Sequence, residues 1–233
     1  ACQIRPTEPM QIYRGFQPDG KRKFRGHAGE GMEKELAVLF LDMRGFTART
    51  TGQLPYAVVF LLNRFFASVV PAIITHGGTV DKYLGDGFLA LFETADATSS
   101  ATAALAAIED ISRALVTFND SLAQEGQSPV AIGIGAHLGA VVLGEIGAAG
   151  NAPRTLIGDT VNTASRVEGA TKGHGVQALI TAPLLVRAGL DLPQTALVQL
   201  ELRGLTAPLA AWPVEDARTL MQQALDLRQP APA

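Results

Sequence analysis

The stretch that decides the fold is LAVLFLDMRGFT, residues 36–47, an apolar run that ends in an aspartate and a glycine-containing turn. The run from Leu36 to Leu41 predicts a buried strand, because short apolar runs beside a turn are typical of strands covered on both faces. Asp42 then stands at the carboxyl end of this strand, where open α/β sheets usually bind ligands. The stretch therefore predicts an α/β protein with an acidic group at a ligand-binding edge.

A second aspartate, Asp86, lies in a similar setting in KYLGDGF, residues 82–88. It falls in a short hairpin between two predicted strands, Thr79–Tyr83 and Phe88–Phe92. Carboxylate oxygens without His or Cys suit Mg²⁺ or Mn²⁺, and a bound phosphate usually completes the coordination shell. A helix cap at Asp42 and a plain hairpin turn at Asp86 are the alternatives. The pair of aspartates predicts a divalent-metal site that binds a nucleotide.

A third cluster is RTLIGDTVNTASR, residues 154–166. Asp159 or Thr160 is predicted to cap the helix that follows. Asn162 and Arg166 are four residues apart and therefore share one face of this helix. An amide and a guanidinium near a positive helix end suit a ribose and a phosphate chain, which agrees with a nucleotide ligand.

These segments resemble the class III nucleotidyl cyclases over about residues 34–215. Four segments occur in the order of that family: the turn at Asp42, the hairpin from Gly78 to Asp86, the stretch Ile157–Asn162 with Arg166, and Leu202-Arg203-Gly204. The resemblance implies an α/β (α+β) fold with a ferredoxin-like mixed sheet, helices packed on one face and extra strands at the end. It also implies an enzyme that converts a nucleoside triphosphate into a cyclic monophosphate and pyrophosphate.

The resemblance assigns a role to each matching position. Asp42 and Asp86 are expected to hold two Mg²⁺ or Mn²⁺ ions, one at the ribose 3′-hydroxyl and one at the β and γ phosphates. Asn162 is expected to orient the ribose, and Arg166 to stabilise charge on the α-phosphate. The remaining substrate-binding positions, which meet the triphosphate, are Gly45, Phe46, Thr47 and Arg203.

Base choice follows from two positions that the resemblance places in the purine pocket, Lys82 and Thr155. A lysine donor meets the N1 acceptor of adenine, whereas guanine presents a protonated N1. The Thr155 hydroxyl can accept from the adenine N6 amine, although Asp is commoner there. This pairing resembles the subclass that includes bicarbonate-responsive adenylate cyclases, so ATP is the expected substrate and bicarbonate a candidate regulator. An exposed strand lysine and a β-branched strand residue are the alternatives.

In the family, one protomer supplies both metal aspartates and the other supplies the Lys, Thr, Asn and Arg set. This chain carries both sets, so the resemblance implies a homodimer with two shared sites. One competing function is a non-catalytic regulatory module, although such domains usually lose a metal Asp or the catalytic Arg. The others are a guanylate cyclase, which typically has Glu and often Cys at the two base positions, and a diguanylate cyclase, whose hairpin tip carries paired acids.

Composition excludes other functions. The 233 residues, 47% hydrophobic and 18% charged, suffice for one core with tails. A net charge of −3 provides no basic field, so nucleic-acid binding is not expected. The four histidines have no ligand spacing and Cys2 is the only cysteine, so neither a zinc site nor a disulfide is predicted.

The chain is expected to divide into a linker or remnant of an upstream domain (1–33), the catalytic domain (34–215), and a C-terminal helix with a disordered tail (216–233). Ala1-Cys2-Gln3 resembles the end of a ferredoxin domain, but one cysteine cannot hold an iron–sulfur cluster. The chain is therefore expected to be a fragment of a longer, membrane-anchored cyclase. No apolar segment is long enough to span a bilayer, so this part is expected to lie in the cytoplasm without membrane contact.

Several further elements are predicted from periodicity and from glycine and proline positions. Residues 130–137 and 140–146 are predicted to form a hairpin that turns at Gly139, followed by a flexible segment at 147–153, which the resemblance implies is a dimerisation arm. The other predicted helices are Pro55–Thr75, Ala95–Gln124, Thr160–Gly169, a short helix from Pro183 and Asp216–Arg228, and the other predicted strands are Gln177–Thr181, Leu197–Leu202 and Leu209–Val214.

Overall fold

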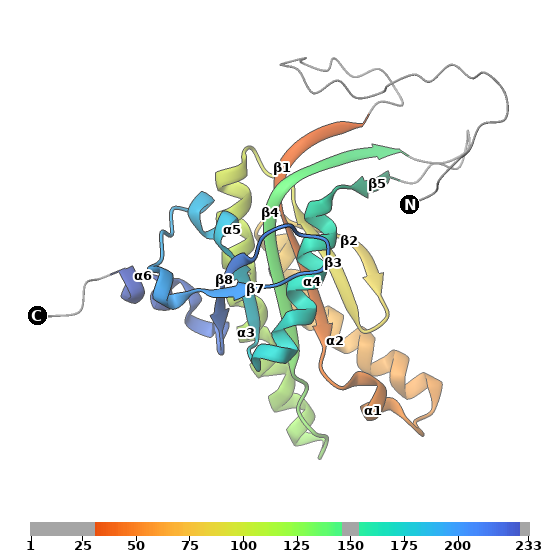
Figure 1. The fold of residues 1–233 in the computed structure, drawn as a ribbon. Coiled ribbons are helices and arrows are strands. Elements are labelled where there is room, and N and C mark those ends of the chain that lie inside the picture. Colours follow the sequence, from red (N-terminus) through yellow and green to blue (C-terminus); the bar gives the residue numbers. More distant parts are fainter. Residues whose placement is uncertain (1–30, 146–153, 229–233) are drawn as a thin grey trace, which may run out of the picture.

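The computed structural model describes residues 31–145 and 154–228. Within these residues, eight strands form one sheet at the centre of the molecule (Figure 1). The elements in chain order are β1 (Met32–Met43), α1 (Phe46–Thr50), α2 (Pro55–Thr75), β2 (Thr79–Leu84), β3 (Gly87–Phe92), α3 (Ala97–Gln124), β4 (Ile132–Glu145), β5 (Arg154–Ile157), α4 (Asp159–His174), β6 (Ala178–Thr181), α5 (Ala182–Arg187), η1 (Gln194–Ala196), β7 (Val198–Leu200), β8 (Leu209–Val214), η2 (Ala217–Thr219) and α6 (Leu220–Arg228).

The sheet is mixed. Its strand order is β2-β3-β1-β4-β6-β8-β7, and β5 pairs with β4 outside this path. β4 and β6 run parallel, whereas the other pairs run antiparallel. The path β1-α2-β2-β3-α3-β4 with the spatial order β2-β3-β1-β4 is the ferredoxin-like arrangement. The predicted fold class, a ferredoxin-like mixed sheet with extra strands at the end, is therefore confirmed.

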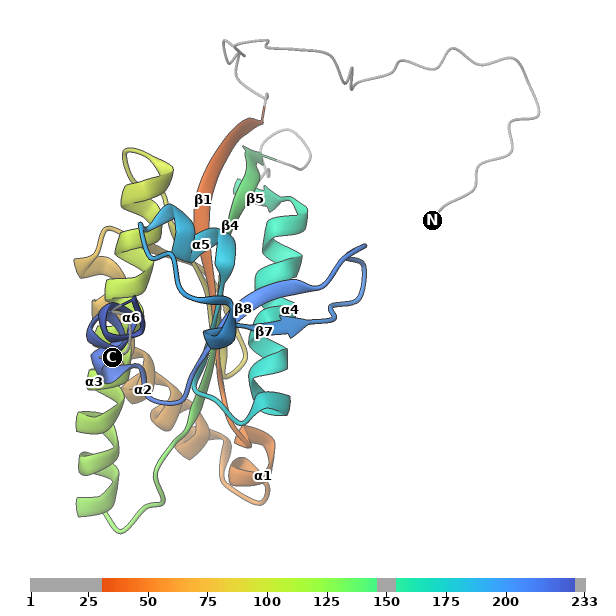
Figure 2. The same ribbon diagram turned by 60° about the vertical axis from the view of Figure 1, so that its left-hand side comes forward.

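Helices cover both faces of this sheet. On one face, Leu39 of β1 packs in the larger core cluster with Phe65 of α2 and Ile108 of α3. On the other face, Val38 packs in a second cluster with Ala164 of α4. Figure 2 shows the sheet nearly edge-on, with α2 and α3 on one side and α4 on the other. The prediction that helices pack on one face was wrong, because β1 is apolar on both faces and each face needs a cover.

β4 is one continuous strand of 14 residues, so the predicted hairpin over residues 130–146 was wrong. Gly139, the predicted turn, pairs with β1 in the middle of the ladder. Its lack of a side chain leaves room for α4, because Thr160 Oγ1 lies 2.6 Å from where a Cβ would stand. β4 pairs with β5 instead, and the predicted dimerisation arm, 147–153, lies outside the described residues.

α4 is longer than predicted and begins differently. It continues past Gly169, its predicted end, to His174, because Gly169 faces open space and imposes no stop. The N-cap residue is Gly158 rather than Asp159 or Thr160. The Thr160 hydroxyl instead donates to a backbone carbonyl of β4 at 2.7 Å. This bond fastens the first turn of α4 to the sheet.

The other elements lie close to their predicted positions. α2 and β8 have the predicted bounds, and α3 starts two residues late because Asp96 caps it by accepting a hydrogen bond from the Ser99 amide. The last helix begins with the short η2 turn rather than at Asp216. β1 starts at Met32, so residues 32–33 of the predicted linker belong to the strand. Residues 1–30 of that linker and the tail at 229–233 lie outside the described residues.

α2 corrects the prediction about membrane spans. With 21 residues and a mean hydropathy of 2.0 it is long and apolar enough to cross a membrane by length and composition, and only 22% of that window is buried. Asn63 and Arg64 interrupt its apolar residues, yet two polar residues with one charge lower the mean hydropathy only a little. In the structure, Leu61 and Phe65 bury one stripe of α2, and Arg64 bonds Glu125 beyond the end of α3.

Candidate active site

Asp42 and Asp86 meet at one end of the sheet. The β1–β3 ladder runs as far as Leu41 and Phe88, so the β2–β3 hairpin lies beside the end of β1. A Cβ on Gly87 would stand 2.2 Å from the Leu41 carbonyl oxygen and 2.8 Å from Asp42 Oδ1. Only glycine permits this close approach, which brings the residue after Asp86 against Asp42.

The pKa values of the two carboxylates are shifted in the way expected for a site that binds a cation. Burial, and then the charge of Asp86, raise the pKa of Asp42, while Arg44 lowers it. Burial also raises the pKa of Asp86. Two half-buried like charges repel each other, and a divalent cation between them would relieve that repulsion. Carboxylate oxygens are the ligands that Mg²⁺ or Mn²⁺ prefers, so the pair fits such an ion.

Glu168 of α4 is a third acid near this pair, and the sequence motifs did not predict it as a site residue. Burial and the charges of Asp42 and Asp86 raise its pKa to about 7, while Arg44 opposes the rise. Ala164, Glu168 and Thr171 follow one another at helical spacing on the side of α4 that faces the sheet. An acid on a stripe of otherwise small or apolar residues was the signal that could have found it.

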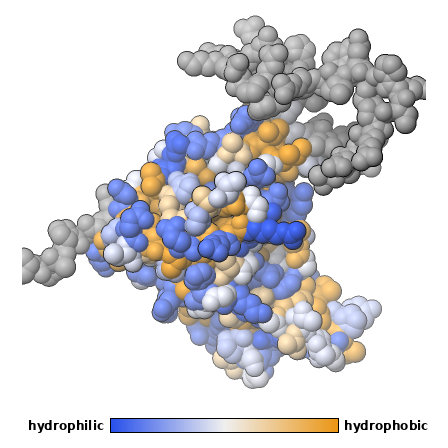
Figure 3. Space-filling view, viewed as in Figure 1, coloured by the Kyte–Doolittle hydropathy of each residue, from blue (hydrophilic) through white to orange (hydrophobic). Residues whose placement is uncertain are grey.

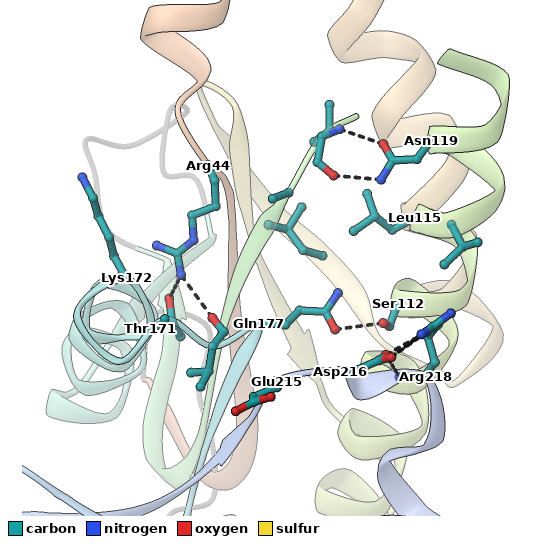
Figure 4. Close-up of a pocket in the computed structure, with 16 residues that line it drawn as sticks. Arg44, Ser112, Leu115, Asn119, Thr171, Lys172, Gln177, Glu215, Asp216 and Arg218 are labelled. Carbon is teal, nitrogen blue, oxygen red and sulfur yellow. Dashed lines mark hydrogen bonds and ion pairs between the residues drawn. The ribbon is translucent and has the colours of Figure 1, made fainter. Parts of the chain in front are cut away.

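Arg44 joins the turn after β1 to other elements. Its backbone amide donates to the Ala131 carbonyl at 2.8 Å. Its Nη2 donates to Thr171 Oγ1 of α4 and, at 3.5 Å, to the Val176 carbonyl. Figure 4 shows this side chain at one wall of a cavity of about 540 Å³, with α3 and Leu115 at the opposite wall. Arg44 therefore holds the turn that follows Asp42 against the end of α4.

The turn itself places its three predicted substrate-binding residues differently. Gly45 adopts the left-handed conformation (φ 66°) and is the N-cap residue of α1, a position that favours glycine. The Phe46 side chain packs against the core cluster. Thr47 is exposed. Thr47 and the backbone of the turn, rather than the Phe46 ring, are the groups turned toward solvent.

Lys82 lies on the same face of the sheet as α4 because β2 is irregular. The β2–β3 register shifts between Val80 and Lys82. Beyond the shift, Lys82 pairs with Leu89 of the α4-side cluster, whereas Tyr83 packs on Phe66 of α2 with ring centroids 4.8 Å apart. Lys82 Nζ is exposed and lies 3.6 Å from the carboxylate of the neighbouring Asp81. A bulge of this kind re-aims a side chain, and here it aims the lysine toward the α4 face.

Asn162 and Arg166 lie together on the exposed face of α4. Arg166 reaches the β7–β8 loop, because its Nη1 lies 3.3 Å from the point where a Cβ on Gly204 would stand. The structure thus brings Arg166 beside the loop that carries Arg203, which is exposed. Thr155 is half-buried in β5, the strand that leads into α4.

One chain does not bring the two sets of residues together. Thr171, which bonds Arg44, lies nine residues after Asn162, a rise of about 14 Å along the helix. Arg166 is about 200° around the helix from Glu168, so it points away from the aspartates. Figure 1 shows α4 running from β5 at the far end of the sheet toward α1. The aspartates and the pair Asn162 and Arg166 therefore form two separate groups within one chain.

Comparison with known proteins identifies the family. Residues 30–204 match the adenylate and guanylate cyclase catalytic domain. An adenylate cyclase of Anabaena cylindrica is 36% identical over 157 residues, which cover 66% of this chain and 30% of that protein. Adenylate cyclase 1 of Rhizobium meliloti is 30% identical over 169 residues, covering 70% of this chain and 25% of that protein. The chain thus spans less than a third of these relatives.

Solved structures agree. The guanylyl cyclase Cya2 has a TM-score of 0.71 at 30% identity and covers 79% of this chain and 93% of its own. The adenylyl cyclase CyaB from P. aeruginosa has a TM-score of 0.67 at 25% identity, with coverages of 82% and 98%. Sheet, helices and half-sites define a nucleotidyl cyclase domain. The chain belongs to the adenylate and guanylate cyclase catalytic domain family, as the sequence resemblance predicted.

Proposed function

We propose that this domain is an adenylate cyclase that converts ATP into 3′,5′-cyclic AMP and pyrophosphate for intracellular signalling. The observation that carries the proposal is the pair Asp42 and Asp86, two half-buried acids that Gly87 allows into close approach. Support comes from the family match and from relatives named adenylate cyclases. In the reaction, the ribose O3′ forms a bond to the α-phosphorus, the bond to pyrophosphate breaks, and the hydroxyl proton leaves to solvent.

Each candidate residue has a role in this reaction. Asp42 and Asp86 hold two Mg²⁺ or Mn²⁺ ions, which supply Lewis-acid activation and charge neutralisation when bound. Asn162 orients the ribose, and Arg166 donates to the α-phosphate, where negative charge grows. The turn at Gly45, Phe46 and Thr47 binds the triphosphate through its backbone and the Thr47 hydroxyl, and Arg203 binds the terminal phosphates.

The proposed base is adenine. The Lys82 ammonium donates to N1 of adenine, and the Thr155 hydroxyl accepts from the N6 amine. The position of Lys82 on the α4 face supports this role, because Asn162 and Arg166 of the same protomer lie on α4. GTP is the alternative substrate, since Cya2 is a guanylyl cyclase.

The proposed active form is a homodimer with two shared sites. The two half-sites of one protomer lie on different sides of α4, so a second protomer must supply the missing half of each site. Arg166 and Asn162 of one protomer then face the aspartates of its partner. We further propose that the domain acts in the cytoplasm, where ATP is available, and that bicarbonate raises its rate. If bicarbonate leaves the rate unchanged at fixed pH, its proposed role as a regulator is contradicted.

The test is cyclic nucleotide formation from ATP and from GTP, with Mn²⁺ and with Mg²⁺, over a protein concentration series. Preferential formation of cyclic AMP, with specific activity that rises with concentration, supports the enzyme, its base choice and the shared site. Preferential formation of cyclic GMP contradicts the base choice alone. No cyclic product under any condition favours the non-catalytic regulatory module.

A further inference from the structure

Three polar atoms from different parts of the chain converge over Gly133 of β4. Arg44 Nη2, Thr171 Oγ1 and Glu168 Oε1 each lie within 2.7 Å of the point where a Cβ on Gly133 would stand. Arg44 belongs to the turn after β1, whereas Glu168 and Thr171 belong to α4. The missing side chain of Gly133 therefore leaves room for a polar junction between this turn and this helix.

The junction is a directional chain of hydrogen bonds. Arg44 Nη2 donates to Thr171 Oγ1, and the Thr171 hydroxyl donates to the Glu168 backbone carbonyl. Arg44 also donates to the Val176 carbonyl just beyond α4. Thr171 is fully buried, so water does not compete easily for its hydroxyl. The turn that follows Asp42 is thus tied to α4, because the charged guanidinium of Arg44 donates to the buried hydroxyl of Thr171.

α4 is well suited to transmit a displacement at this junction. Its backbone rests directly on β4, because a Cβ on Gly135 would stand 2.1 Å from the Glu168 amide nitrogen. Asn162 and Arg166 lie on the same continuous helix as Thr171. A shift of the turn at Arg44 is therefore carried along α4 to the side chains that contact ribose and phosphate.

We propose that Arg44 is a positioning residue that clamps the turn after the proposed metal ligand Asp42 to α4 and thereby couples the two active sites of the dimer. This inference rests on the proposed function, because only in a shared-site dimer do Asp42 and Arg166 of one protomer serve different sites. Nucleotide bound at the first site orders the turn that follows Asp42. The clamp then orders α4 of that protomer, which prepares the second site and gives positive cooperativity for ATP.

Thr171→Val is the variant that tests the clamp. Valine keeps the shape of the buried side chain but removes the hydroxyl that accepts from Arg44, and Thr171→Ser restores a hydroxyl. The matched control is Arg49→Gln, because Arg49 lies in the same region and its guanidinium donates to the Ser128 and Pro129 carbonyls rather than to α4. All variants are compared by thermal unfolding so that loss of fold is recognised.

The first readout needs no turnover. Amide hydrogen exchange of residues 44–50 in the metal-free protein should be about tenfold faster in Thr171→Val, since a hydrogen bond to a charged donor is worth roughly a factor of ten. Thr171→Ser should exchange like the wild type, and Arg49→Gln should leave the exchange of α4 unchanged. Equal exchange in the wild type and Thr171→Val overturns the clamp.

The second readout is the Hill coefficient for ATP. We expect a value above 1 in the wild type, near 1 in Thr171→Val, and near the wild-type value in Thr171→Ser and Arg49→Gln. A wild-type value that Thr171→Val leaves unchanged overturns the coupling, even if hydrogen exchange supports the clamp. An inactive wild-type protein contradicts the proposed function and with it the coupling, whereas the exchange result still decides the clamp.

Discussion

His137 lies in the middle of β4 and has no role in the proposed reaction. Its Nδ1 is 2.9 Å from Thr181 Oγ1 of β6, and burial lowers its pKa from 6.5 to about 4. The ring therefore stays neutral in the folded protein under conditions where the unfolded chain binds a proton. Because the unfolded state gains the proton first, this residue makes the fold less stable as pH falls.

We predict that the free energy of unfolding falls by about 3 kcal/mol through this one group between pH 6.5 and pH 4. Above pH 6.5 both states are neutral and the effect is absent. His137→Gln removes the titration, so its stability should depend less on pH within this window. Urea unfolding at pH 7.5 and pH 4.5 measures the difference, and equal pH dependence in both proteins would contradict the assignment.

Gly87 is the residue on which the approach of the two aspartates depends. We predict that Gly87→Ala lowers activity by about a hundredfold or more, because its methyl group would stand 2.2 Å from the Leu41 carbonyl and push the hairpin away from Asp42. The fold should survive, since Gly87 lies just beyond the end of the β1–β3 ladder and outside the hydrophobic core clusters. Steady-state kinetics and circular dichroism together check this, and an active Gly87→Ala protein would contradict the close approach.

At the scale of elements, the glycines of β4 determine how α4 docks. We predict that Gly135→Ala destabilises the protein by about 1–3 kcal/mol, because the methyl group would stand 2.1 Å from the Glu168 amide nitrogen and neither backbone can yield. Gly169→Ala is the matched control on α4, where a Cβ meets nothing within 4 Å. It should stabilise the helix by about 0.5–1 kcal/mol. Urea unfolding of both variants at pH 7.5 distinguishes them, and equal effects would count against the docking.

Elements with a clear period and clear caps could be predicted from the sequence, and those shaped by contacts could not. Pro55 and the apolar stripe defined α2 within its final bounds. Gly139 was predicted to form a turn and Gly169 to end a helix, and both predictions were wrong. Gly139 makes room for Thr160 in the middle of a strand, whereas Gly169 faces open space within a continuous helix. A glycine in a sequence does not show whether it serves a turn, a close packing contact or neither.

The site shows the same division. The motifs predict Asp42, Asp86, Asn162 and Arg166 as site residues, because few chemistries use these residues in this order. They could not identify Glu168, whose raised pKa depends on burial against residues more than eighty positions away. They also could not show that a register shift in β2 turns Lys82 to the face of α4. Side-chain direction depends on strand pairing, which the local sequence does not specify.

At the scale of the whole molecule, the separation of the two half-sites is the feature with the largest consequence. The aspartates lie where β1 and the β2–β3 hairpin end, and Asn162 and Arg166 lie on the outward face of α4. The proposed cyclase reaction uses both groups at one site, and this separation is why we propose an active unit of two copies.

The most direct test of this account is complementation between two inactive variants. Asp42→Ala removes a metal ligand and Arg166→Ala removes the charge-stabilising guanidinium, so each homodimer should form no cyclic AMP. In a mixture, one of the two sites of each heterodimer combines an intact aspartate pair with an intact α4. We predict that mixing restores cyclic AMP formation from ATP, up to about a quarter of the wild-type rate for random pairing of equal amounts. No recovery, at concentrations where the mixed dimer is shown to form, would contradict the shared active site.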